Sequence, residues 1–285
     1  MTDIDFDLER SWWNEKASKE ERIGPDVLIN RALRWREIER RLDGVSSILE
    51  VGAATGVFSI PLARRGFNVT HLDFSPAMLE IARENARGIQ NITFVEANAT
   101  DLSEFEDRSF DLVLNMDGAI SFSGVRAGEA VRESCRVTKK TLILTVSNRA
   151  QMAALCFADS VTETGRILPA VHEMFLHGQW RQEQFPDNAL LAKGNTQNRI
   201  GPLKAYLPTE LRDLLQSAGM SVLRCGGLGS LTAFCDAELI TRLSTDKLLL
   251  EPFLDLCEQF DTEIMPDGPG TRNRAGLIAV AAPRP

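Results

Sequence analysis

The segment 47–56 constrains the fold of this 285-residue chain more than any other part of the sequence. Residues 47–51 form a short apolar run, which is typical of a buried strand. A turn of small residues, Gly52-Ala53-Ala54-Thr55-Gly56, follows directly, and apolar residues then recur at helical spacing up to Ala63. Pro61 is compatible with a helix because its missing N–H is not needed in the first turn. The segment therefore predicts a strand, a tight turn, and a helix that starts just after Gly56.

The same alternation of strand and helix continues through much of the chain. Further apolar strand candidates are residues 67–72, 92–95, 110–114, 141–146, 221–225 and 276–281. Helical spacing of apolar residues predicts helices at 25–42, 125–135, 209–218 and 237–260. Ser75-Pro76 has the residue types that cap and begin one more helix. Strands that alternate with helices predict an α/β fold with a mostly parallel sheet.

Two stretches interrupt this pattern and divide the chain. We expect an N-terminal helical cap at 1–44 and an α/β core made of 45–147, 204–228 and 275–285. Residues 148–203 and 229–274 then form insertions outside the sheet, which we expect to act as a lid and substrate pocket. Open α/β sheets bind ligands at the carboxyl ends of their strands, so this pocket should lie over those ends.

Composition and charge exclude several classes of partner. The chain carries 32 Lys and Arg against 40 Asp and Glu, a formal net charge of −8, so we expect no nucleic-acid partner and no membrane binding. The N-terminus is acidic, and no apolar run approaches the roughly 20 residues that span a bilayer. The five cysteines are widely spaced without a CxxC pair, which predicts neither disulfides nor a metal site. We therefore expect a soluble cytoplasmic protein that binds small molecules.

An acid at the end of the second strand indicates what the glycine-bearing turn binds. A ligand can approach the backbone of this turn because the side chains at Gly52 and Ala54 are tiny. Asp73 follows Gly52 by 21 residues, a position from which a carboxylate accepts hydrogen bonds from a ribose diol. A dinucleotide fingerprint needs glycines at positions 54 and 57, which hold Ala54 and Val57. The pattern therefore predicts an adenosine ligand other than a dinucleotide.

The arrangement resembles the class I S-adenosylmethionine-dependent methyltransferases, whose first motif reads acid-x-Gly-x-Gly-x-Gly. Glu50, Gly52 and Gly56 match this motif, while Ala54 replaces the middle glycine. Segment 70–79 resembles the second motif, which assigns the ribose hydroxyls to Asp73 and the adenine face to Phe74. Segments 94–102 and 110–118 resemble the motifs at the third and fourth strands. The resemblance implies that S-adenosylmethionine contacts Glu50, Gly52, Ala53, Ala54, Gly56, Asp73, Phe74, Met78, Asn98, Ala99, Asn115 and Met116.

Two of the later motifs imply specific contacts. Asn98 stands where the family has an aspartate that contacts the adenine amino group, and an asparagine carbonyl can accept the same hydrogen bond. The Ala99 amide would then lie beside the ring. Asn115 and Met116 would lie next to the methionine part of the cofactor.

Several of these residues also have ordinary structural interpretations. Glu50 alone could be an edge charge and Asn98 alone a turn residue, while Phe74 and Met78 could be core residues. His71 lies on the same strand face as Asp73, and we expect a structural role for it. Trp12 and Trp13 either pack a helix onto the core or close over the cofactor.

The resemblance implies a Rossmann-like fold with a mostly parallel seven-stranded sheet, helices on both faces and an inserted lid. The implied activity is methyl transfer from S-adenosylmethionine to a small, largely apolar or aromatic acceptor, which leaves S-adenosylhomocysteine. The catalytic residues are unknown; the candidates are His172, His177 and Asp117, of which the two histidines could act as a general base and Asp117 could contact the substrate. The fourth motif lacks the (Asn/Asp)-Pro-Pro-aromatic signature of enzymes that methylate bases or glutamine. The alternative is an enzyme of the same fold that keeps the cofactor as structure and catalyses a cyclisation, isomerisation or decarboxylation.

Overall fold

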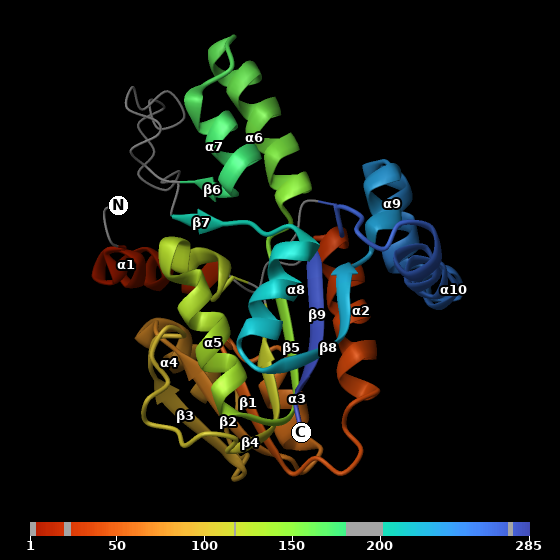
Figure 1. The fold of residues 1–285 in the computed structure, drawn as a ribbon. Coiled ribbons are helices and arrows are strands. Elements are labelled where there is room, and N and C mark those ends of the chain that lie inside the picture. Colours follow the sequence, from red (N-terminus) through yellow and green to blue (C-terminus); the bar gives the residue numbers. More distant parts are fainter. Residues whose placement is uncertain (1–3, 20–23, 117, 181–201, 273–275) are drawn as a thin grey trace.

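The core of the structure is one seven-stranded sheet (Figure 1). The computed structural model describes residues 4–19, 24–116, 118–180, 202–272 and 276–285. The strand order is β3-β2-β1-β4-β5-β9-β8, with bounds Ile92–Glu96, Asn68–Asp73, Ser47–Val51, Phe110–Asn115, Thr138–Val146, Leu277–Pro283 and Met220–Gly227. Strands β1 to β5 pair in parallel, and β9 is antiparallel to both β5 and β8. The predicted α/β fold with a mostly parallel seven-stranded sheet is confirmed.

Helices cover both faces of this sheet. On one face, α2 (Pro25–Glu39) and α3 (Ser59–Arg64) share a buried core with Ile48 of β1. On the other face, α5 (Ala127–Val137) and α8 (Pro208–Ser217) share a core with Leu49. Neighbouring residues of β1 point to opposite faces because side chains alternate along a strand. Both faces of the parallel strands are therefore apolar and buried, as such strands require.

The first turns of the helices that follow β1 and β2 are set by side chains. Ser75 caps α4 (Pro76–Asn85), because its hydroxyl accepts a hydrogen bond from the Met78 amide at 3.2 Å. Helix α3 begins at Ser59, two residues after the predicted start, and Gly56 itself lies in the left-handed region with a φ of 95°. The Ser59 amide donates to Glu50 Oε2 at 2.7 Å, so a carboxylate of β1 binds the first amide of that helix.

The single helix predicted at 237–260 is wrong, because two helices occupy this stretch. Helix α9 (Ala237–Thr245) and helix α10 (Lys247–Gln259) meet at Asp246, whose backbone is extended (φ −87°, ψ 108°). The Asp246 side chain accepts a hydrogen bond from the Leu248 amide at 2.9 Å and so begins the second helix. The break comes from capping chemistry, which apolar periodicity alone does not reveal.

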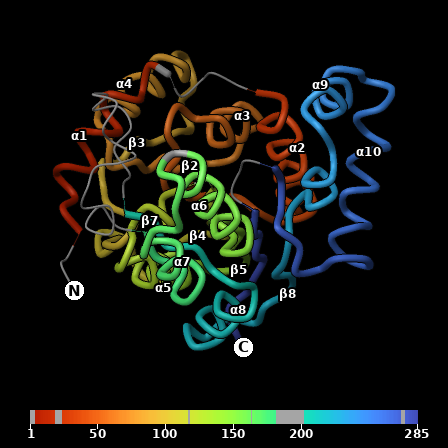
Figure 2. Tube along the Cα trace, turned by 90° about the horizontal axis from the view of Figure 1, so that it is seen from above, coloured from red at the N-terminus to blue at the C-terminus, as the bar shows by residue number. Residues whose placement is uncertain are grey.

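The first insertion forms a helical hairpin above the carboxyl ends of the strands. Helices α6 (Arg149–Thr164) and α7 (Pro169–His177) pack together and project from the sheet, as Figures 1 and 2 show. The strands β6 (Gln179–Trp180) and β7 (Leu203–Lys204) form a two-stranded ribbon at the base of the hairpin. Helix α1 (Phe6–Lys16) lies beside α4. The carboxyl end of the sheet is thus flanked by elements from the N-terminal part and from the middle of the sequence.

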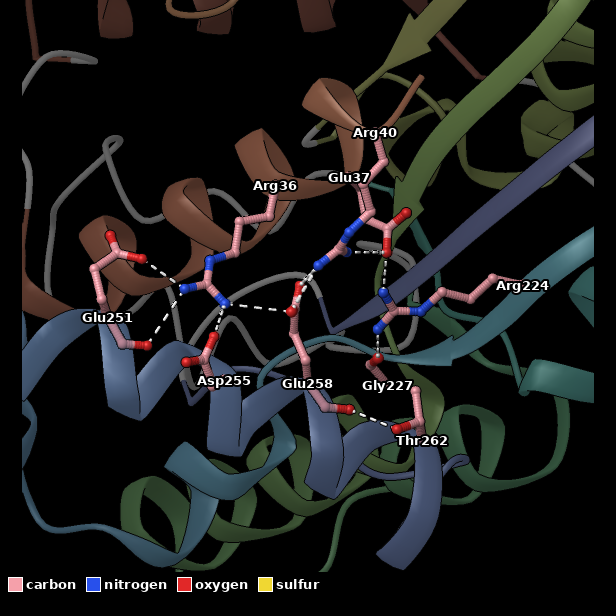
Figure 3. Close-up of polar contacts among 9 residues, drawn as sticks. All are labelled: Arg36, Glu37, Arg40, Arg224, Gly227, Glu251, Asp255, Glu258 and Thr262. Atoms are coloured by element: carbon pink, nitrogen blue, oxygen red, sulfur yellow. Dashed lines mark hydrogen bonds and ion pairs between the residues drawn. The ribbon is translucent and has the colours of Figure 1, made fainter. Parts of the chain in front are cut away.

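Ion pairs attach α10 to α2 (Figure 3). Arg36 of α2 contacts three carboxylates of α10, at 2.5 Å from Glu251, 2.7 Å from Asp255 and 3.2 Å from Glu258. Arg40, one helical turn later, contacts Glu258 at 2.7 Å. The second insertion is therefore held against the outer side of α2.

Glu37 links the same helix to the sheet. Its carboxylate is only 4% exposed and accepts hydrogen bonds from Arg40 and from Arg224 of β8 (Figure 3). A buried carboxylate between two guanidinium groups is stable only while both remain, because its charge has lost its water. This contact ties α2 to the far edge strand of the sheet.

No helix in the described ranges is long and apolar enough to cross a membrane. Within the same ranges, no group of three or more His, Cys, Asp or Glu side chains is placed to hold a metal ion. The five cysteines are free thiols, and burial raises the pKa of Cys135 to about 12.

Candidate functional site

A cavity of about 470 Å³ opens at the carboxyl ends of the central strands. Its floor is formed by segments that follow four neighbouring strands: Gly52 and Ala54 after β1, Asp73 and Phe74 after β2, Asn98 and Ala99 after β3, and Gly118 and Ala119 after β4. The strand order reverses between β1 and β4, and open α/β sheets bind ligands at such a switch point. The volume falls within the range of small-molecule sites.

At Gly52, two segments of the cavity floor approach each other closely. Its φ is 68°, and a Cβ added there would lie 2.5 Å from the Cβ of Ala119. The turn after β1 and the loop after β4 therefore approach each other as closely as glycine allows. A larger residue at position 52 would displace one of these two segments, and both line the cavity.

Asp73 is the last residue of β2 and lines the cavity floor. Its Oδ2 accepts from the Ala54 amide at 2.8 Å, and its Oδ1 accepts from the Ser75 amide at 2.9 Å. The Phe74 amide is a further donor to this carboxylate. An ionised carboxylate offers about four lone-pair positions, so it keeps acceptor capacity for a ligand. Burial raises the pKa of this carboxyl from 3.8 to about 6, although the backbone amides oppose the shift. At neutral pH the site therefore presents an ionised acceptor that suits a pair of hydroxyl groups.

Buried polar side chains form hydrogen bonds to the turn after β1 and to the helix that follows it. Ala54 has a φ of 47°, and its carbonyl accepts from Nε2 of His71 at 3.1 Å. His71 has no exposed surface, and burial lowers its pKa to about 4, so the ring is neutral. Its Nδ1 lies 2.7 Å from the hydroxyl oxygen of Ser59, whose amide is held by Glu50. His71 thus contacts the turn itself, whereas Glu50 binds the first amide of α3. Neither residue lines the cavity.

The third strand places Asn98 and Ala99 at the cavity, and the second places Phe74 and Met78 there. Asn98 Oδ1 accepts from both the amide and the hydroxyl of Thr100, each at 3.0 Å. Both lone pairs of that oxygen are therefore engaged, and the amide nitrogen is the group that Asn98 can offer to a ligand. The contact of its carbonyl with an adenine amino group stays a prediction.

Four other predicted cofactor residues lie behind the floor. Ala53, Gly56 and Met116 are all absent from the cavity lining, and Met116 belongs to the core on the α2 face. Asn115 is also absent from the lining; it is fully buried, and its Nδ2 donates to Ser134 Oγ at 3.1 Å. Its Oδ1 has no hydrogen-bond partner among the described residues. The contribution of the fourth strand to the cavity comes instead from the loop that follows, at Gly118 and Ala119.

The two N-terminal helices supply a wall that sequence reasoning missed. The lining residues from α1 and α2 are Phe6, Glu9, Trp13, Val27, Asn30 and Arg31. The four-residue spacing of Glu9 and Trp13 places them on one helix face, which is visible in the sequence. The sequence does not reveal that this face meets the cavity. Of the two tryptophans, Trp13 lines the cavity, and Trp12 packs against its ring with centroids 4.8 Å apart.

Helix α1 is fastened to the start of α4. Asn14 Oδ1 accepts from Ser75 Oγ at 2.6 Å and from the Ala77 amide at 3.3 Å. Arg10 Nε donates to the Phe74 carbonyl at 3.1 Å. These contacts join α1 to the loop that carries Asp73 and Phe74, so the wall and the floor of the cavity are physically linked.

The first insertion contributes another part of the wall through Gln151, Met152, Leu155 and Leu203, next to Ser147 at the end of the core segment. Within 229–272, no described residue lines the cavity, although this insertion was also expected to form the pocket. Thr271 nonetheless acts from behind, because its hydroxyl accepts from Asn30 Nδ2 at 2.9 Å and its carbonyl accepts from Gln151 Nε2 at 2.7 Å. It therefore orients the side chains of two lining residues.

Neither of the two histidines predicted as candidates for a general base lines the cavity. His172 and His177 are both exposed on α7. Asp117 lies outside the described residues. The titratable side chains among the described lining residues are Glu9, Arg31 and Asp73.

Comparison with known proteins gives consistent results. Residues 48–141 match the family model of a methyltransferase domain. The chain is 37% identical to the demethylmenaquinone methyltransferase of Tropheryma whipplei (strain Twist) over 108 residues, which is 37% of this chain and 44% of that protein. It is 35% identical to the demethylmenaquinone methyltransferase of Renibacterium salmoninarum over 156 residues, 51% of this chain and 61% of that protein. The matched region thus spans less than two thirds of either relative.

Solved structures share the fold. An S-adenosylmethionine-dependent methyltransferase from Mesorhizobium loti superposes with a TM-score of 0.55 at 17% identity, covering 89% of this chain and 99% of that chain. At this identity the likeness concerns the fold alone. The family-model match at 48–141 includes the turn after β1, Asp73, and the segment after β3, which form most of the cavity floor.

Proposed function

We propose that the chain is a class I S-adenosylmethionine-dependent methyltransferase. It would transfer a methyl group from S-adenosylmethionine to a small organic acceptor. The observation that carries this proposal is the cavity at the switch point of the sheet. There the close approach at Gly52 adjoins the buried carboxylate of Asp73, which keeps acceptor capacity for a ligand. A nucleoside fits such a floor because it needs a flat backbone surface and a carboxylate for its ribose.

The residues that would hold the cofactor are those on the cavity floor. Asp73 would accept the ribose hydroxyls, while Phe74 and Met78 would offer apolar contact to the adenine. The Asn98 amide nitrogen is a donor that suits a ring nitrogen of adenine. Gly52 and Ala54 would allow the methionine part to lie close to the backbone. When bound, the sulfonium of S-adenosylmethionine supplies an activated methyl group.

We infer that the acceptor has an apolar or aromatic body. The walls beyond the floor carry the aromatic rings of Phe6, Trp13 and Phe122 and the aliphatic chains of Met152 and Leu155. Such walls favour a flat, largely apolar molecule through burial and ring contacts. The polar groups of Glu9 and Arg31 would fix its orientation. Because two relatives are named for demethylmenaquinone, that compound is the first acceptor to test.

The work required of the protein is alignment and exclusion of water. Residues of helix α1 and of helix α6 line the cavity, so we expect the two helices to shield the space above the floor. Holding two reactants in line replaces a bimolecular encounter by an effectively unimolecular step. An acceptor that reacts through a lone pair or as an anion needs no protein base, which agrees with a lining that contains no described histidine.

The test is calorimetric titration with S-adenosylhomocysteine, together with product analysis. Binding by the wild-type chain and a loss of at least about thirtyfold in Asp73→Ala are expected, because ionised acceptors make strong hydrogen bonds to hydroxyls. Glu96→Ala is the matched control, because Glu96 ends the neighbouring strand but is exposed and outside the lining. Absence of binding at millimolar concentration would overturn the proposal. Turnover without release of S-adenosylhomocysteine would instead favour the non-methylating alternative.

A further inference from the structure

We propose that His71 is the positioning residue that allows alanine to stand at the middle of the turn after β1, and that it thereby keeps this turn in the shape that receives the cofactor. The inference deepens the proposed function, on which it rests, because it concerns the same site. His71 does not line the cavity, so it would act through Ala54 and not on a ligand.

The turn holds a residue in a conformation that its side chain disfavours. Gly52, Ala54 and Gly56 all have positive φ, at 68°, 47° and 95°. Glycine adopts this region freely, whereas a Cβ at positive φ crowds the following carbonyl oxygen. Arg108 and Ala54 are the two non-glycine residues with positive φ in the described structure. Position 54 therefore needs support that a glycine would not need.

Two side chains of β2 provide that support. His71 Nε2 lies 3.1 Å from the Ala54 carbonyl oxygen, and Asp73 Oδ2 accepts from the Ala54 amide at 2.8 Å. Residues two apart on a strand point to the same face, so both side chains reach the same turn. The two polar groups of Ala54's backbone are thus both bound from one strand. The residue cannot leave the left-handed region without breaking at least one of these bonds.

The direction of the hydrogen bonds follows from the partners. A carbonyl oxygen only accepts, so Nε2 of His71 carries the proton. In the neutral ring Nδ1 is then an acceptor, so the Ser59 hydroxyl donates to it at 2.7 Å. The Ser59 amide in turn donates to Glu50 at 2.7 Å. The ring is therefore fixed in position and tautomer by the first turn of α3, as a brace must be.

The brace affects the cavity through Asp73. If the turn relaxed, the Ala54 amide would move away from the carboxylate that it now orients. That carboxylate is the predicted partner of the ribose hydroxyls, and Ala54 itself lines the cavity. Loss of the His71 contact should thus weaken binding of an adenosine ligand, and only while residue 54 carries a Cβ.

A double-mutant cycle tests this dependence. The four proteins are wild type, His71→Leu, Ala54→Gly and the double variant, titrated with S-adenosylhomocysteine and melted thermally. His71→Leu should weaken binding about tenfold when residue 54 is alanine, and less than about threefold when it is glycine. His71→Gln, whose amide nitrogen can still donate to the Ala54 carbonyl, should retain most of the affinity. Val69→Ala, on the same strand face, is the control whose effect should not depend on residue 54.

Several outcomes overturn the inference. An equal loss of affinity in the alanine and glycine backgrounds would mean that His71 supports folding in general. No loss in His71→Leu would remove the role altogether. If His71→Leu does not fold, the cycle is repeated with Ser59→Ala, which frees the ring, and the same rescue by glycine is required. If the wild type does not bind S-adenosylhomocysteine, the proposed function fails, while the midpoints of thermal unfolding still decide whether residues 71 and 54 are coupled.

Discussion

Removal of the Asn14 side chain is expected to free α1 without unfolding the sheet. Asn14 Oδ1 accepts from Ser75 Oγ at 2.6 Å and from the Ala77 amide at 3.3 Å. The other hydrogen bond described above for this docking is that from Arg10 to the Phe74 carbonyl. Each such bond contributes about 0.5–1.5 kcal/mol net, so Asn14→Ala should cost about 2 kcal/mol. The opening equilibrium of α1 would then rise about thirtyfold.

The measurement is hydrogen exchange in peptides that cover α1 and β1. Exchange in α1 should accelerate, while exchange in β1 should not change, because its apolar residues lie in the two cores that α1 does not enter. Asn14→Asp is the matched control: its carboxylate can accept both hydrogen bonds and lies at the N-terminus of α4, where negative charge is favourable. Affinity for S-adenosylhomocysteine should fall in the alanine variant only, because Phe6, Glu9 and Trp13 line the cavity.

Two results would refute this reasoning. If α1 exchanged no faster in Asn14→Ala than in wild type, the docking of the helix would not depend on the contacts with Ser75 and Ala77. If β1 and α1 accelerated together, α1 would be part of the global folding unit and not a separately docked helix.

The structure leads to three further predictions. Gly52→Ala should abolish measurable binding of S-adenosylhomocysteine and lower the free energy of unfolding by about 2–4 kcal/mol, because the new Cβ would lie 2.5 Å from that of Ala119 at a positive φ; retained binding in calorimetry would contradict it. The folded-state pKa of Asp73, raised from 3.8 to about 6, means that its contribution to stability is present below pH 4 and is lost as the pH rises through 6. In urea titrations from pH 4 to pH 7.5, the unfolding free energy of wild type relative to Asp73→Asn should therefore fall by up to about 3 kcal/mol, and a constant difference would speak against this shift. Glu37→Gln should cost about 2–3 kcal/mol because it removes a buried charge between Arg40 and Arg224, whereas Glu39→Gln, in an exposed pair, should cost less than about 1 kcal/mol in the same denaturation assay.

The cavity floor was predictable because its parts are encoded locally. The turn after β1 and the acid after β2 belong to one strand–helix–strand unit, and such units have one handedness and place their strands side by side. Gly52 and Asp73 therefore had to meet at the carboxyl edge of the sheet, and both line the cavity. The resemblance to the methyltransferase motifs implied the positions of Phe74, Asn98 and Ala99, and all three line the cavity.

The residues predicted for the site at the end of β4 differ from those that line the cavity. Asn115 and Met116 were predicted to lie next to the methionine part of the cofactor. Asn115, the last residue of β4, and Met116, which follows it, are buried and outside the cavity lining, where Gly118 and Ala119 are found. Strand periodicity indicates the face on which a side chain lies, but it does not show where the backbone turns out of the sheet. The chain leaves the sheet after β4 next to Gly52, at the close approach of Gly52 to Ala119. This approach joins two different segments, the turn after β1 and the loop after β4.

The sequence by itself determined the sheet and most residues of the floor, since each depends on neighbours within one supersecondary unit. Only the tertiary structure decided the walls. Asn14 meets Ser75 across 61 residues, and Asn30 meets Thr271 across 241, and neither contact leaves a periodic signal in the chain. Apolar spacing shows that α2 is amphipathic, but which surfaces α1 and α2 cover depends on specific polar contacts between distant segments, and these exist only once the chain has folded.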